Sequence, residues 1–127
     1  MATLADAQRL EGKLGEALAT ADQALLMNPE QVTYRPEIYR IRGEVHRMLA
    51  RPELAEADFQ AAIGLSEKIG AKAWELRATM SLVHLLSQQG RRDEARTMLA
   101  DIYDWFTEGF DTADLKDAKA LLNELSD

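Results

Sequence analysis

The sequence repeats one short pattern three times without a gap. Each copy has a small residue, a mostly polar four-residue turn, an alanine, and apolar side chains four and seven positions after that alanine. The copies occupy residues 12–24, 50–62 and 90–102, and their alanines stand 38 and then 40 residues apart. Offsets of four and seven keep side chains on one face of an α-helix. Each copy therefore predicts a turn followed by the second helix of a helical hairpin, and three copies predict a stacked array.

The middle copy belongs to the most complete hairpin, residues 36–69. Gly43 in its first helix would let a second backbone come close, and Phe59 in its second helix would fill the space between the two. Pro36 and Pro52 each stand where a first helical turn begins, which is the one place where a helix tolerates a missing N–H. These features predict two helices folded back on each other.

We therefore expect an all-α fold, namely an α-solenoid of about three antiparallel helix hairpins plus a C-terminal capping helix. The 127 residues suit a single repeat domain, which would span residues 1–127. The expected hairpins lie at about residues 2–27, 36–69 and 72–106, and the capping helix lies at about residues 113–125.

Three local signals mark the ends of these elements. Pro29 ends the first hairpin, because the residue before a proline is pushed out of helical dihedrals. Gly70 is expected to end the second hairpin in the left-handed conformation, and Asp111 or Thr112 to cap the last helix. That helix carries one apolar stripe, which would seal the end of the array: Leu115, Ala118, Leu121, Leu122 and Leu125.

The middle hairpin resembles the tetratricopeptide repeat. Gly43, followed by Ala55, Phe59 and Ala62, matches the pattern of that family, and Pro29 falls where the pattern places proline after its second helix. The resemblance covers nearly the whole chain. It implies a non-catalytic protein-interaction or regulatory module that binds a peptide or protein partner in a concave groove.

Residues 74–125 also resemble the C-terminal tail of large bacterial signalling proteins. Those proteins join a class III nucleotide cyclase domain, or a DNA-binding domain, to a predicted ATPase and then to helical repeats. This resemblance implies an alternative function, in which the chain is the effector-sensing tail of a larger cyclase, ATPase or transcriptional regulator. Any cyclase or ATPase activity would then reside in other domains.

Motifs for catalysis, cofactors or metals are missing from the sequence. It has no GxxxxGK[ST] phosphate loop and no cysteine, and its two histidines, His46 and His84, stand 38 residues apart in different hairpins. Residues 12–15, GKLG, match the GxxG of a nucleic-acid-binding loop, but the aligned repeats identify them as a hairpin turn. We therefore expect no catalytic residue, no cofactor and no metal site.

Charge and hydropathy restrict the partners. With 22 acidic and 15 basic residues the net charge is −7, which disfavours nucleic acid and anionic membranes. No apolar run approaches the roughly 18 residues of a membrane span. We expect a cytoplasmic protein whose partners are proteins.

The tetratricopeptide resemblance also implies where a partner would bind. In such arrays the first helix of each hairpin lines the concave groove, so groove positions can be counted from the small residue of each first helix. The candidate groove residues are Asp6, Arg9, Arg40, Glu44, Arg47, Met80, His84 and Ser87.

The three arginines of this set have two interpretations. Arg40 and Arg47 lie seven positions apart on one helix face, and with Arg9 they could clamp a carboxylate or phosphate of a partner. Alternatively, Asp6, Glu37 and Glu44 neutralise these arginines within the array. His84 could sense pH from the groove, or it could be a surface histidine without such a role.

The two ends of the array carry further apolar residues. Tyr103, Trp105, Phe106 and Phe110 either form a contact patch for a partner or, as we favour, pack under the stripe of the last helix. No capping helix precedes the first hairpin, so we expect an exposed apolar face around Met1, Leu4 and Ala5. A neighbouring domain or a second copy of the chain would cover it, the latter giving a homodimer.

Overall fold

The computed structural model describes residues 2–27, 35–107, 109 and 112–126, and these residues form an all-helical chain. Its helices are α1 (Ala2–Leu10), α2 (Leu14–Met27), α3 (Arg35–Met48), α4 (Pro52–Ile69), α5 (Lys72–Gln88), α6 (Arg92–Trp105) and α7 (Ala113–Ser126). The predicted all-α class is confirmed. None of these helices is long and apolar enough to cross a membrane.

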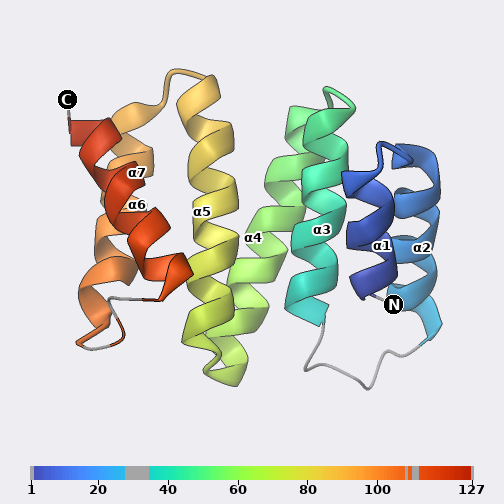
Figure 1. Cartoon of the computed structure of the whole chain (residues 1–127), viewed down its shortest axis with the longest axis horizontal. Helices are drawn as coiled ribbons and strands as arrows, with labels where there is room; N and C mark the ends of the chain where they lie inside the picture. The colour runs from blue at the N-terminus through green and yellow to red at the C-terminus, as the bar shows by residue number, and fades with distance from the viewer. Residues whose placement is uncertain (1, 28–34, 108, 110–111, 127) are drawn as a thin grey trace.

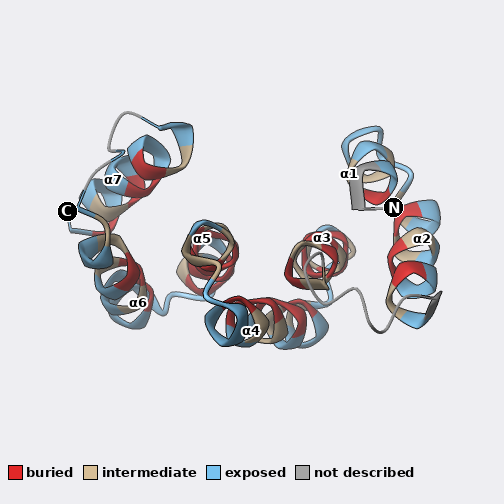
Figure 2. Cartoon of the chain, turned by 90° about the horizontal axis from the view of Figure 1, so that it is seen from below, coloured by how far each residue is buried: buried red, intermediate tan, exposed pale blue. Residues whose placement is uncertain are grey.

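The helices form two layers that follow a shallow arc. Each helix packs against the next one in sequence, and α1, α3, α5 and α7 also contact one another in turn. Figure 2 shows these four helices along the inner, concave side and α2, α4 and α6 along the outer side. The last helix, expected as a cap, thus takes the inner position of a fourth hairpin (Figure 1).

Helices α3 and α4 pack tightly against each other at Gly43. A Cβ atom at this position would lie 2.5 Å from Cε1 of Phe59, whose side chain is fully buried between α3 and α4. Only a residue without a side chain fits there. The role predicted for the Gly43–Phe59 pair is therefore present in the structure.

The small residue that opens each sequence repeat has a positive φ angle. Gly12, Ala50 and Gly90 have φ angles of 80°, 60° and 78°. After each of them the next backbone N–H donates to a carbonyl five residues earlier, as in the bond from Arg51 to His46 at 2.9 Å. This is the Schellman ending of a helix. Gly70, with φ 72°, ends α4 in the same left-handed conformation, as predicted.

A partly buried arginine joins the first two hairpins. Arg42 on α3 donates two hydrogen bonds to the buried Asp58 of α4, at 2.7 and 2.9 Å, and a third to Asp22 of α2, at 2.8 Å. The hydrogen bonds to Asp58 raise the pKa of Arg42 above the ordinary value of an arginine, so Arg42 stays charged. Nε2 of His46 lies 3.7 Å from the same carboxylate, and burial lowers the pKa of His46 below its ordinary 6.5.

The two ends of the array differ in part from the prediction. At the N-terminal end Leu4 is 52% exposed, but Ala5 is buried against α2 and α3, so it does not belong to an exposed face. Met1 lies outside the described residues, and so does Pro29. Ala5 is buried because it stands at the small position of the first helix, which faces its neighbours.

At the C-terminal end the stripe of α7 is buried, with Leu122 partly so. Thr112 accepts a hydrogen bond from the backbone N–H of Leu115 at 3.4 Å and so caps the helix; Asp111 lies outside the described residues. Tyr103 and Phe106 pack against the core, as favoured.

Trp105 does not follow that prediction. It is 57% exposed, packs edge-on against Phe106 with ring centroids 5.1 Å apart, and lies 5.4 Å from the ammonium group of Lys72. Together with Ile63 and Lys72 it lines a cleft formed by α4, α5 and α6 instead. Phe110 lies outside the described residues.

Candidate binding groove

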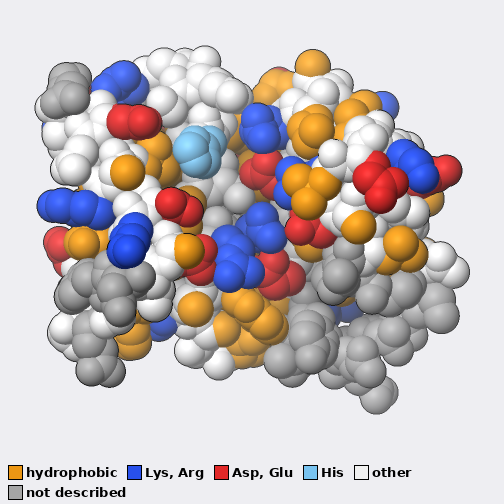
Figure 3. Space-filling model, viewed as in Figure 1, with side chains coloured by type: hydrophobic (Ala, Val, Ile, Leu, Met, Phe, Trp, Pro, Cys, Tyr) orange, Lys and Arg blue, Asp and Glu red, His pale blue; other side chains and the backbone are white. Residues whose placement is uncertain are grey.

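The concave face is the candidate site. The first helices α1, α3 and α5 line it, as the tetratricopeptide resemblance implies, and α7 extends it by one further helix. Figure 3 looks onto this face, where acidic and basic side chains lie next to each other across the middle. The sequence-derived candidates are distributed over three of these helices, so they do not form one compact cluster.

Each candidate arginine is paired with an acidic residue three positions earlier in its own helix. Arg9 binds Asp6 at 2.7 Å, Arg40 binds Glu37 at 2.8 Å, and Arg47 binds Glu44 at 2.8 Å. All three guanidinium groups also donate a second hydrogen bond, from Nε, to the same carboxylate oxygen. This arrangement corresponds to the second interpretation of the arginines, in which acidic residues neutralise them within the array.

Arg77 links three inner helices across the face. This residue of α5 donates to Glu37 of α3 at 3.2 Å and to Asp114 of α7 at 3.0 Å. Burial acts to lower its pKa, but the bond to Asp114 and the charge of Glu37 outweigh burial and raise it. The candidate groove residues did not include Arg77, although the repeat spacing could have found it. Arg77 stands at the same distance before Val83 as Glu37 does before Gly43.

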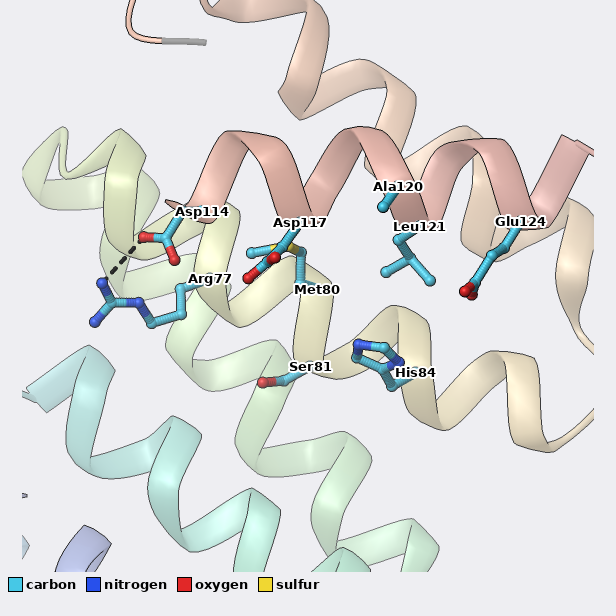
Figure 4. Close-up of a pocket in the computed structure, with 9 residues that line it drawn as sticks. All are labelled: Arg77, Met80, Ser81, His84, Asp114, Asp117, Ala120, Leu121 and Glu124. Atoms are coloured by element: carbon cyan, nitrogen blue, oxygen red, sulfur yellow. Dashed lines mark hydrogen bonds and ion pairs between the residues drawn. The ribbon is translucent and has the colours of Figure 1, made fainter. Parts of the chain in front are cut away.

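A cleft of about 410 Å³ separates α5 from α7 on this face. Its lining comes from both helices: Arg77, Met80, Ser81, His84, Asp114, Asp117, Ala120, Leu121 and Glu124. Figure 4 shows Asp117 and Glu124 extending from α7 toward α5, with Met80 and Leu121 between the helices. Of the sequence-derived candidates, Met80 and His84 line the cleft, whereas the partly buried Ser87 does not.

The α7 side of the cleft was not anticipated. Asp114, Asp117, Leu121 and Glu124 follow one another at offsets of three, four and three, so they share a helix face that borders the buried stripe and includes its Leu121. That spacing was available in the sequence, but the helix was interpreted only as a cap. Among the described residues, no group of three or more potential ligands is arranged to hold a metal ion.

Stacked helical hairpins whose inner helices line a concave face form a tetratricopeptide-like helical repeat fold. The structure is similar to that of the Yersinia enterocolitica type III secretion translocator chaperone SycD, with a TM-score of 0.76. The similarity covers 98% of this chain and 80% of that chain at 16% sequence identity, which shows a shared fold. No protein-family model and no curated protein matches the sequence.

Proposed function

We propose that the chain is a non-catalytic protein-interaction module that holds an extended segment of a partner protein along its concave face. The observation that carries the proposal is the continuous inner surface of α1, α3, α5 and α7, which contains an open cleft between α5 and α7. SycD is a translocator chaperone of type III secretion, and that likeness supports a protein as the partner.

The ion pairs of the groove support the same proposal. Glu37, Arg77 and Asp114 connect α3, α5 and α7, so the inner helices are held in place before a partner arrives. A binding surface that is already ordered loses less conformational entropy on association. This arrangement suits a module whose task is to present a fixed surface to a flexible segment.

The absence of cysteine from the sequence allows a direct test. Peptide ligands would be selected from a random phage library, and a nitroxide label attached to His84→Cys, in the α5–α7 cleft, or to Thr97→Cys, exposed on the outer helix α6. We expect the label at position 84 to broaden the NMR signals of a bound peptide and the label at position 97 to leave them sharp. Equal broadening, or broadening only from position 97, would contradict the proposal.

A second candidate rests on the exposed leucines of the first hairpin. Leu4, Leu10 and Leu26 are 52%, 72% and 81% exposed. If the repeats form the effector-sensing tail of a larger cyclase, ATPase or regulator, a neighbouring domain would cover these side chains. In the isolated chain a second copy would cover them, giving a two-fold dimer.

Light scattering tests self-association through this hairpin. We expect a dimer mass that falls to the monomer mass in the double variant Leu4→Glu/Leu10→Glu. A monomer at high protein concentration, before any substitution, would show that the first hairpin does not pair with itself.

A further inference from the structure

We infer that the cleft between α5 and α7 receives a lysine or arginine side chain, so that the segment held by the concave face is basic at this point. The inference rests on the proposed function and specifies the chemistry of its partner. It reverses the sign expected from the candidate arginines, which would have favoured an acidic partner.

The charges that line the cleft favour a positively charged side chain of the partner. Arg77, its one arginine, already binds Glu37 and Asp114. Asp117 and Glu124 also line the cleft, and neither side chain forms an ion pair or hydrogen bond with any described residue. The cleft therefore has two carboxylates available to a cation, whereas its guanidinium group is already occupied.

The shape and the apolar lining favour a long cationic side chain over a small ion. Residues seven positions apart in a helix are separated by about 10 Å along its axis. Asp117 and Glu124 are thus too far apart to ligate one metal ion. Leu121 and Met80 lie between them in Figure 4. Lysine and arginine pack their methylene groups on such apolar surface and keep the charged group at its polar edge.

The lining of the cleft also includes a hydroxyl group, that of Ser81. Its oxygen can accept a hydrogen bond from the N–H groups of a guanidinium or ammonium that enters the cleft.

The test is an NMR titration of the ¹⁵N-labelled chain with N-acetyl-arginine N-methylamide. The matched probes are the citrulline derivative, which has the same shape without the charge, and the glutamate derivative. We expect saturable shifts of amides in residues 80–87 and 117–124 with the arginine derivative and none with the other two. The double variant Asp117→Asn/Glu124→Gln should weaken binding by up to about fivefold, since one guanidinium group pairs with one of these carboxylates at a time and an exposed pair contributes up to about 1 kcal/mol.

The control is the double variant Glu53→Gln/Asp93→Asn, which removes the same charge from exposed positions on the outer helices α4 and α6. It should bind the arginine derivative as the unmodified chain does. Equal binding of the citrulline derivative, or an equal loss in both double variants, would overturn the inference. Because the spin-label experiment with selected peptides does not depend on Asp117 or Glu124, it separates this failure from failure of the proposed function.

Discussion

At the scale of single residues, the array depends on positions where one atom decides the packing. Gly43 lies against Phe59, Ala50 holds a left-handed turn, and His46 is buried beside Asp58. The first two belong to the sequence repeat, which is why they could be recognised before the structure. The surroundings of His46 could not, because Asp58 is on the neighbouring helix and outside the repeat pattern.

The substitution Gly43→Ala should destabilise the chain. The added methyl group would lie 2.5 and 2.7 Å from two ring atoms of Phe59, and such overpacking costs about 1–3 kcal/mol. Chemical denaturation measures the change. The control is Gly64→Ala, also in the middle of a helix, where nothing lies within 4 Å of the new methyl group, so that helix propensity should raise stability by up to about 1 kcal/mol. Equal effects of both substitutions would contradict the packing argument.

The substitution Ala50→Gly should stabilise the chain. Ala50 has a φ of 60°, and the left-handed conformation costs an L-residue about 1–2 kcal/mol, part of which returns as the greater backbone entropy of unfolded glycine. We expect a net gain of about 0.5–1 kcal/mol. The converse change, Gly90→Ala at the equivalent turn, should lower stability by a similar amount. Melting temperatures of the two variants that move in the same direction would disprove this account.

The free energy of unfolding should fall between about pH 7.5 and about pH 5.5 because of His46. Burial lowers the pKa of His46 in the folded state below 6.5, despite the carboxylate of Asp58, and the nearby Arg42 and Arg51 act in the same direction. In that window the unfolded chain binds more protons, so stability decreases as the pH drops. Urea unfolding at both pH values gives the change in the free energy of unfolding with pH. This change should be smaller in His46→Gln than in the control His84→Gln. The same pH dependence in both variants would assign the loss of stability to other titrating groups.

At the scale of elements, α7 has two roles that follow from two faces. Its stripe of leucines and one alanine is buried against α5 and α6, and this role was predicted from the apolar spacing. Its polar face supplies Asp114, Asp117 and Glu124 to the groove. That role was missed because the repeat alignment ends before α7, and the groove positions were counted only within the three hairpins.

Arg77 should control how firmly α7 is attached. In Arg77→Met the bonds to Glu37 and Asp114 are lost, at a cost of about 0.5–1 kcal/mol for partly exposed pairs. We expect faster amide hydrogen exchange in α7, with exchange in α2 unchanged. Arg91→Met is the matched control, since it removes bonds to Glu56 and Glu94 on the outer helices. If both variants accelerate exchange in α7 equally, the link through Arg77 is not what holds this helix.

At the scale of the whole molecule, the two hydrophobic clusters differ in the size of their side chains. The larger cluster extends from α4 to α7 and contains Phe59 and many leucines, whereas the smaller one joins α1 and α2 to α3 through alanines and two isoleucines. Small side chains bury less apolar area per residue. The first hairpin is therefore the weakest part of the array.

Native-state hydrogen exchange should detect this gradient. Amides of α1 and α2 are expected to open at lower free energy than those of α4 and α5, because repeats depend on their nearest neighbours for stability. The substitution Ala21→Leu is not expected to strengthen this hairpin, since Ala21 is 1% exposed and a larger side chain in a packed core costs about 1–3 kcal/mol. Uniform protection across the chain would indicate a single cooperative unit.

The sequence predicted the array better than the groove, for a physical reason. Helix hairpins depend on local periodicity and on small residues at fixed offsets, and both are visible along the chain, as at Gly43 and Gly70. The groove depends on which charges meet across helices, as in the contact of Arg77 with Asp114, 37 positions later. Such pairs become visible only when the register of the stacked helices is known.

The ion pairs of Arg77 have a further consequence, for the sequence pattern of the segments that the groove can bind. The two pairs favour one arrangement of α3, α5 and α7, so a ligand that matches this arrangement binds without moving the helices. Successive side chains of an extended segment point to opposite sides. Moving a basic residue by one place would therefore turn it away from the α5–α7 cleft, whereas moving it by two would keep its direction. A fixed face of this kind would select segments by whether their basic residues stand at even spacings. It would tolerate wide variation in the residues between those basic residues.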